Sequence, residues 1–148
     1  MPVKHIAEMA RSRGIITMID AAQSAGQFPV DLAALGVDAY AMAGQKWLCG
    51  PGGSGALFVR KDRLGDIRPT YVRYGAFDPH GFVVPPEGSP RFEMGEMYNP
   101  AIRAFNVGLT WIRDEVTFAW AQTRIANLGQ KTRSRVGGDR WCHRQHPA

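Results

Sequence analysis

Two charged residues, Asp20 and Lys46, each come shortly after an apolar segment, and this pairing constrains the chain more than any other feature. The segments 15–19 and 37–42 are short apolar runs bounded by turn residues, a pattern that predicts strands. The first run is almost unbroken, which favours a strand covered on both faces. Ligands of open parallel sheets bind beyond the carboxyl ends of the strands, so we expect Asp20 and Lys46 to face one crevice.

Helices and strands alternate along the first sixty residues. Apolar side chains at helical spacing predict a helix over 3–13 that ends at Gly14. Asp31 is placed to cap a short helix over 32–35, closed by Gly36. A Gly-rich turn then leads into a further strand over 56–60. This alternation indicates an α/β fold.

The second half of the chain is predicted to contain a long loop and a long helix. Residues 68–90 carry five of the ten prolines and read as an irregular loop, and 91–95 resemble the end of a strand. Asn99 can cap a helix with Pro100 at its first position. An apolar stripe in steps of four and three supports that helix: Ala101, Phe105, Leu109, Ile112, Val116 and Ala119. We interpret Trp111, Phe118 and Trp120 as packing residues.

Composition fits one globular domain and places the positive charge in the tail. The chain has 148 residues, 45% of them hydrophobic and 10% aromatic. The formal net charge is +5, and residues 131–148 hold five basic residues against one acidic residue. Such a tail could touch phosphate groups, but a solvated end is commoner, so we expect a disordered or foreign tail and no nucleic-acid partner.

No membrane or secretory segment is indicated. The sequence has no apolar run long enough to span a bilayer, and its start lacks the apolar core of a signal peptide. Cys49 and Cys142 do not form a disulfide framework or a zinc motif. We therefore expect a cytoplasmic protein without a metal site and without a membrane partner.

Two motifs resemble a known family. Asp-Ala-Ala-Gln-Ser-Ala-Gly at 20–26 and Gly-Gln-Lys-Trp-Leu-Cys-Gly-Pro-Gly-Gly-Ser-Gly at 44–55 are similar to the class V aminotransferases, which are fold-type I enzymes that use pyridoxal 5′-phosphate (PLP). The Gly-Gln-Lys-Trp form is closer to the isopenicillin-N epimerase-like and cysteine desulfurase-like branch than to the desulfurases proper. The resemblance runs from about Pro2 to about Leu128. It implies that residues 1–130 form part of a large domain, a three-layer α/β sandwich with a mixed sheet, in a homodimeric parent enzyme.

The resemblance also implies site roles. Lys46 matches the lysine that forms the internal aldimine, Asp20 the acid that pairs with the pyridinium nitrogen, and Gln23 the residue near the phenolic oxygen of the ring. The chemistry is consistent, because a carboxylate keeps the ring nitrogen protonated and the freed lysine can act as a base at the substrate Cα. The expected function is a PLP-dependent transformation of an amino acid by transamination, epimerisation or C–S lyase chemistry. Without the resemblance, an Asp after a strand is usually a turn cap and a Lys beside Trp a surface group.

The sequence departs from the family pattern at several positions. Ala43 and Gln45 stand where desulfurases have Ser and His, so Gln45 can still hydrogen-bond the cofactor and Ala43 cannot. Glu96 replaces a Thr that contacts the phosphate of the neighbouring subunit's PLP. Cys49 is expected to be a packing residue, because the desulfurase nucleophile belongs to a later segment. The chain also lacks a counterpart of the family's phosphate loop, stacking aromatic and carboxylate-binding Arg. The alternative expectation is therefore a non-catalytic fragment that keeps only the fold and self-association.

Overall fold

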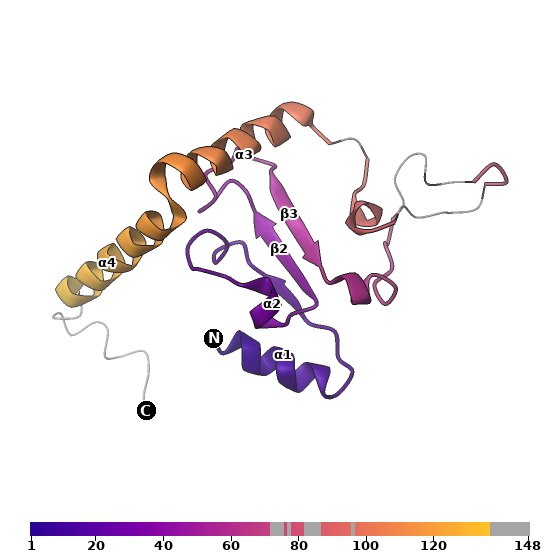
Figure 1. Ribbon diagram of the computed structural model, residues 1–148, viewed down its shortest axis with the longest axis horizontal. Helices are drawn as coiled ribbons and strands as arrows, with labels where there is room; N and C mark the ends of the chain where they lie inside the picture. The colour runs from indigo at the N-terminus through magenta and orange to yellow at the C-terminus, as the bar shows by residue number, and fades with distance from the viewer. Residues whose placement is uncertain (72–75, 77, 82–86, 96, 137–148) are drawn as a thin grey trace.

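The computed structural model describes residues 1–71, 76, 78–81, 87–95 and 97–136. Its elements in chain order are α1 (Val3–Arg11), β1 (Met18–Asp20), α2 (Leu32–Leu35), β2 (Ala39–Ala43), β3 (Gly55–Val59), 3₁₀ turns at Lys61–Arg63 and Ser89–Phe92, α3 (Asn99–Trp111), a π-helical turn (Ile112–Val116) and α4 (Phe118–Val136). Figure 1 shows β2 and β3 side by side, with α3 running across one end of both strands.

The sheet is mixed. Strand β1 pairs in parallel with β2, with Asp20 opposite Ala41. Strand β2 pairs antiparallel with β3, with Ala43 opposite Gly55. A parallel pair joined through α2 and an antiparallel pair joined by a turn together confirm the predicted α/β class with a mixed sheet.

The first two helices form for the predicted local reasons. Helix α1 ends at Arg11, two residues before the expected end, and the chain reverses through Gly14, which has a φ of +68°. The side chain of Asp31 accepts a hydrogen bond from the backbone N–H of Ala34 at 3.0 Å, as an N-cap does. Gly36 closes α2 in the left-handed conformation, with a φ of +72°.

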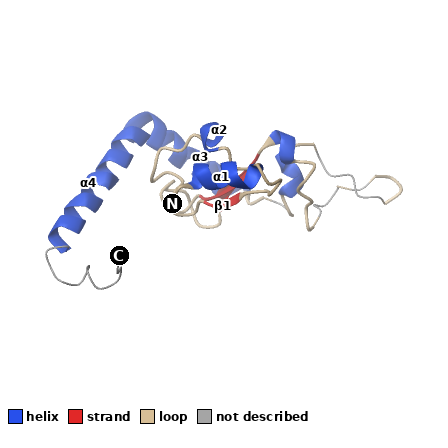
Figure 2. Cartoon of the chain, turned by 90° about the horizontal axis from the view of Figure 1, so that it is seen from below, coloured by secondary structure: helices blue, strands red, loops and turns tan. Residues whose placement is uncertain are grey.

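The core gathers between the helices and the middle strand. Figure 2 shows α1, α2 and α3 close to the strands, whereas α4 extends away from them. The buried side chains come from α1, the segment after β1, the link between α2 and β2, β2 itself, the turn after β2 and α3: Ala7, Ala21, Ala25, Val37, Tyr40, Leu48 and Phe105. Three of these, Ala21, Ala25 and Leu48, belong to the segments that carry the candidate site residues, so the core itself holds these segments in place.

Strand β1 is shorter and more exposed than predicted. It covers only Met18–Asp20, while Ile15 and Ile16 precede it and are exposed. Ile19 packs against the core, but Met18 on the other face is 65% exposed. Among the described residues, the expectation of a strand covered on both faces is therefore wrong, because Met18 leaves one face of β1 exposed.

The second half of the chain differs from the prediction in three places. Residues 91–95 do not form a strand end; Ser89–Phe92 is a 3₁₀ turn, and Arg91 donates to the carbonyl of Leu64 at 3.0 Å. The expected long helix is divided by the π-helical turn and by Thr117, which has a φ of +62°. Trp111 and Trp120 are 53% and 61% exposed, so only Phe118 of the three expected packing residues contacts the core.

Helix α4 continues to Val136, six residues into the segment predicted to be a disordered or foreign tail. Residues 137–148 lie outside the described residues, so the origin of that tail stays a prediction. Among the helices that the structure describes, none combines the length and apolarity that a membrane span requires.

Candidate active site

Asp20 ends β1, and the backbone after it fixes the orientation of its carboxylate. The backbone N–H of Ala22 donates to Oδ1 of Asp20 at 2.9 Å, an Asx-type turn that occupies one carboxylate oxygen. The backbone N–H of Ala21 donates to the carbonyl of Ala41 at 2.8 Å, which ties the same turn to β2. The side chain of Asp20 is exposed, and no described residue hydrogen-bonds to its Oδ2. This oxygen is free to accept a hydrogen bond from a ligand.

Lys46 belongs to a tight turn, residues 44–50, that follows β2. Two backbone hydrogen bonds close it: Cys49 N–H to the carbonyl of Lys46 at 3.0 Å and Gly50 N–H to the carbonyl of Gly44 at 2.7 Å. Gly44 N–H also donates to the carbonyl of buried Ser54 at 2.8 Å. Lys46 itself is exposed, and none of the hydrogen bonds or ion pairs among the described residues engages its amine. The turn is therefore rigid at its base and presents a free amine.

Helix α3 packs closely against the turn that carries Lys46. A Cβ added to Gly50 would lie 2.5 Å from Cδ2 of Phe105, and one added to Gly108 would lie 3.2 Å from the carbonyl oxygen of Cys49. A larger residue at position 50 would therefore require Phe105 to shift, and a larger residue at position 108 would have little room. Helix α3 therefore packs directly against the lysine-bearing turn.

Gln23 connects the two segments. The indole Nε1–H of Trp47 donates to Oε1 of Gln23 at 3.1 Å. The structure therefore brings Gln23, from the turn after β1, against the residue next to Lys46. This contact was not foreseen from the sequence, although both residues lie within the motifs that carry the family resemblance.

The other predicted positions are less engaged. Gln45 is exposed, next to Lys46, and Ala43 is the last residue of β2. The side chain of Cys49 is exposed, so its expected packing role is wrong; only its backbone contacts α3. Glu96 lies outside the described residues.

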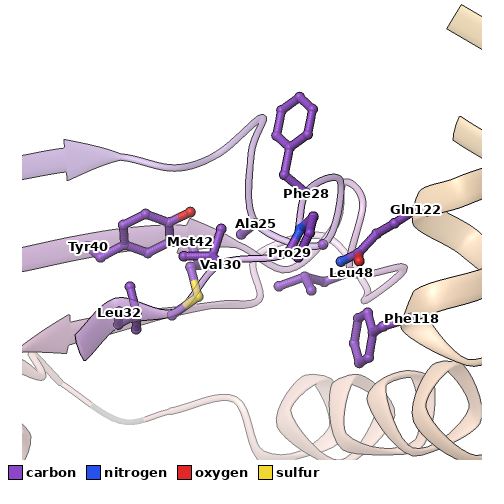
Figure 3. Close-up of a pocket in the computed structure, with 11 residues that line it drawn as sticks. Ala25, Phe28, Pro29, Val30, Leu32, Tyr40, Met42, Leu48, Phe118 and Gln122 are labelled. Carbon is purple, nitrogen blue, oxygen red and sulfur yellow. The ribbon is translucent and has the colours of Figure 1, made fainter. Parts of the chain in front are cut away.

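A separate apolar pocket of about 410 Å³ lies between β2, the segment 25–32 and α4 (Figure 3). Phe118 and Gln122 reach it from α4, and Leu48 lines it from the lysine turn. The hydroxyl of Tyr40 is already engaged with Oγ of Ser24 at 3.0 Å. None of the four predicted site residues is among the described residues that line this pocket.

The buried residue Asp38 was not singled out from the sequence. Asp38, just before β2, is 2% exposed and accepts from the backbone N–H and the hydroxyl of Thr17 at 2.8 and 2.9 Å. Arg63 donates to its other oxygen at 3.1 Å, and Arg60 lies 3.3 Å from that oxygen. An aspartate inside an apolar run was the available signal, because a buried carboxylate requires such partners. Asp38 lies at the end of β2 opposite to Lys46 and fastens the sheet.

An α/β fold with a carboxylate at the end of one strand and a lysine after the end of the parallel neighbour can hold a PLP cofactor at the carboxyl ends of its strands. The chain belongs to the aminotransferase class-V family, whose model matches residues 1–139. This family uses PLP as its cofactor.

Three relatives support the assignment. The isopenicillin N epimerase of Amycolatopsis lactamdurans is 43% identical over 81 residues, which cover 55% of this chain and 20% of the epimerase. The cysteine desulfurase of Thermococcus onnurineus NA1, in its apo structure, superposes with a TM-score of 0.80 at 25% identity, over 92% of this chain and 34% of that chain. The cystine C–S lyase C-DES, in a variant with glycine covalently linked to the PLP cofactor, gives a TM-score of 0.75 at 30% identity, over 93% of this chain and 37% of that chain. The chain thus spans between a fifth and about a third of these proteins.

The residues present fit part of a PLP site. Asp20 offers an unengaged carboxylate oxygen to a protonated ring nitrogen, and Lys46 offers an unengaged amine to an aldehyde. Gln23 has its carbonyl oxygen engaged, so its amino group is left to donate to a phenolic oxygen. These donors and acceptors match three different parts of the cofactor ring.

Proposed function

We propose that this chain carries the lysine side of a PLP site and takes part in the transformation of an amino acid by transamination, epimerisation or C–S lyase chemistry. The observation that carries the proposal is the parallel pairing of β1 with β2: Asp20 ends β1, and Lys46 lies in the turn that follows β2. The hydrogen bond between Trp47 and Gln23 supports it, because it joins the two segments that bear these groups.

Each residue has a defined task in this proposal. PLP, when bound, supplies an electron sink that stabilises negative charge at the substrate Cα. Asp20 accepts a hydrogen bond from the ring nitrogen and favours its protonated state. Lys46 would hold the cofactor through its amine, and the same amine, when free, would take the proton from the substrate Cα. Gln45 stands beside Lys46 and can donate to the cofactor from the same turn.

Covalent trapping tests the proposal. The purified chain is incubated with PLP, reduced with borohydride and digested, and the modified lysine is located by mass spectrometry. We expect the label on Lys46 and its loss in Lys46→Ala, whereas Lys61→Ala, which removes an exposed lysine after β3, retains it. Labelling spread evenly over exposed lysines, or unchanged in Lys46→Ala, would contradict the proposal.

A second candidate function is a non-catalytic fragment that keeps the fold and associates with itself. Exposed Ile15, Ile16 and Met18 beside β1 favour it, because large apolar side chains along a sheet edge promote association. The trapping experiment separates the two candidates, since the fragment alone gives no selective label on Lys46. Dimer formation, as in the parent family, is compatible with either.

A further inference from the structure

Trp47 directly follows Lys46, and its side chain is turned back toward the neighbouring segment. Its indole ring is about one-third exposed, at 37%, and its Nε1–H reaches Oε1 of Gln23 at 3.1 Å. An indole nitrogen can only donate a hydrogen bond. The contact therefore decides which end of the Gln23 amide faces Trp47: the oxygen is held there, and the amino group is turned elsewhere.

A second contact, independent of the indole, joins the same two segments. Gly26 has a φ of +85°, and a Cβ at this position would lie 2.8 Å from the carbonyl oxygen of Trp47 and 2.9 Å from Cδ2 of Leu48. The backbone of Trp47 thus approaches the segment after β1 as closely as a glycine permits. Backbone contact and side-chain hydrogen bond together keep the turn at 21–26 in a fixed position relative to the turn at 44–50.

We infer that Trp47 is a positioning residue for the cofactor site, acting through Gln23. This inference rests on the proposed function and adds to it a residue that touches neither the cofactor nor the substrate. A phenolic oxygen that carries negative charge needs a donor, and the amide of Gln23 can offer either a donor or an acceptor. Trp47 holds the acceptor end, so that the donor end is available to the cofactor.

The inference is tested by comparing Trp47→Phe with Trp120→Phe. Trp47→Phe keeps an aromatic ring and removes the donor, while Trp120→Phe makes the same change at an exposed tryptophan of α4. We expect Trp47→Phe to weaken PLP binding about five-fold, the size of one net hydrogen bond, and Trp120→Phe to leave it unchanged. Labelling of Lys46 by borohydride trapping persists in both variants at saturating PLP.

A pH titration of the visible absorbance of bound PLP supplies a readout that a purely structural role would not move. When Gln23 no longer donates a hydrogen bond to the phenolic oxygen, more negative charge stays on that oxygen. The oxygen then raises the pKa of a neighbouring protonated group. The midpoint of the titration is expected to rise in Trp47→Phe and to stay unchanged in Trp120→Phe. In a Gln23→Ala background, Trp47→Phe should have no further effect on binding or midpoint, because the residue acts through Gln23.

Nuclear magnetic resonance of the cofactor-free chain checks the contact directly and does not depend on how well Trp47→Phe folds. The indole Nε1–H resonance of Trp47 should shift in Gln23→Ala, while Gln23→Glu, which keeps an oxygen acceptor and loses the amino group, should preserve the contact and weaken PLP binding. Three results would overturn the inference and leave the proposed function standing. They are an indole resonance that does not shift in Gln23→Ala, a titration midpoint that does not change in Trp47→Phe, and a loss of PLP binding from Trp47→Phe that is equally large in the Gln23→Ala background. A wild-type chain without selective label on Lys46 would overturn both.

Discussion

Asp38 shows how a single buried carboxylate can hold the sheet that positions the site. Burial pushes its pKa upward, but hydrogen bonds from Thr17 and Arg63 and the charge of Arg60 outweigh burial and leave the pKa below its ordinary value. These partners come from the segment before β1 and from the end of β3 and the turn that follows it. One residue therefore joins all three strands at the end opposite to Lys46.

The replacement Asp38→Asn is expected to destabilise the chain by about 2 kcal/mol, because Thr17 and two guanidinium groups lose a charged acceptor while the arginines stay partly hydrated. Urea denaturation measures the change. Asp62→Asn is the control, since Asp62 also pairs with Arg60 but its side chain is 65% exposed, and exposed pairs contribute little. An equal effect of both replacements would show that Asp38 has no special role.

The same carboxylate gives the stability a pH dependence. Because its pKa is lowered in the folded state, its stabilising effect is complete above the ordinary value of 3.8 and is lost as the pH falls through the lower folded-state pKa. Urea denaturation at a series of pH values from 5 downward should therefore show a steeper loss of stability in the wild-type chain than in Asp38→Asn. Parallel curves would contradict the assigned cause.

The sequence identified some residues and not others for physical reasons. Asp20 and Lys46 were predictable because strand ends can be located from apolar runs, and the parallel pairing of β1 with β2 confirms that both follow the same end of the sheet. Their catalytic roles remain predictions. The partners of Asp38 and the link between Gln23 and Trp47 were not predictable, because each contact joins residues more than twenty positions apart and depends on the final packing of the turns.

At the scale of elements, local signals were reliable where one residue controls a boundary. The side chain of Asp31 and the left-handed conformation of Gly36 define α2 as predicted. The long helix was predicted less well, because an apolar stripe in steps of three and four does not reveal a change of direction. The π-helical turn and Thr117 separate α3 from α4, and this break allows Phe118 to pack on the core while α4 extends outward (Figure 1).

Thr117 is the strained point of that break. Its φ of +62° and ψ of 135° belong to a region that β-branched residues rarely adopt. Its hydroxyl also accepts from the backbone N–H of Trp120 at 3.2 Å. Thr117→Gly should raise the stability by about 0.5–1 kcal/mol, since relief of strain exceeds the small cost of replacing the cap by glycine. Thr117→Ala keeps the backbone strain and loses the hydrogen bond of the cap, so it should lower the stability. Thermal and urea denaturation of the two variants give the comparison, and a loss of stability in both would show that the strain is not relieved.

At the scale of the whole molecule, the described surface carries an apolar strip that a self-contained fold would cover. Ile15, Ile16 and Met18 are 54%, 41% and 65% exposed, and β1 pairs on one side only with β2 among the described strands. A short open edge flanked by apolar side chains is a site for association with another chain. The strip lies at the start of the strand that carries Asp20, so association there would cover the amino end of β1.

Replacing Met18 by lysine tests whether this strip mediates association. Sedimentation velocity over a range of concentrations should show larger species for the wild-type chain and a shift toward the monomer for Met18→Lys, because a charged side chain cannot be buried in an apolar contact without a partner. Met9→Lys on α1, at a residue that is 44% exposed, adds the same charge outside β1 and should leave the distribution unchanged. Selective borohydride labelling of Lys46 should persist in both variants, since neither alters the turn that holds the lysine. A distribution that responds equally to both replacements would assign the association to net charge, and the edge of β1 would then have no part in it.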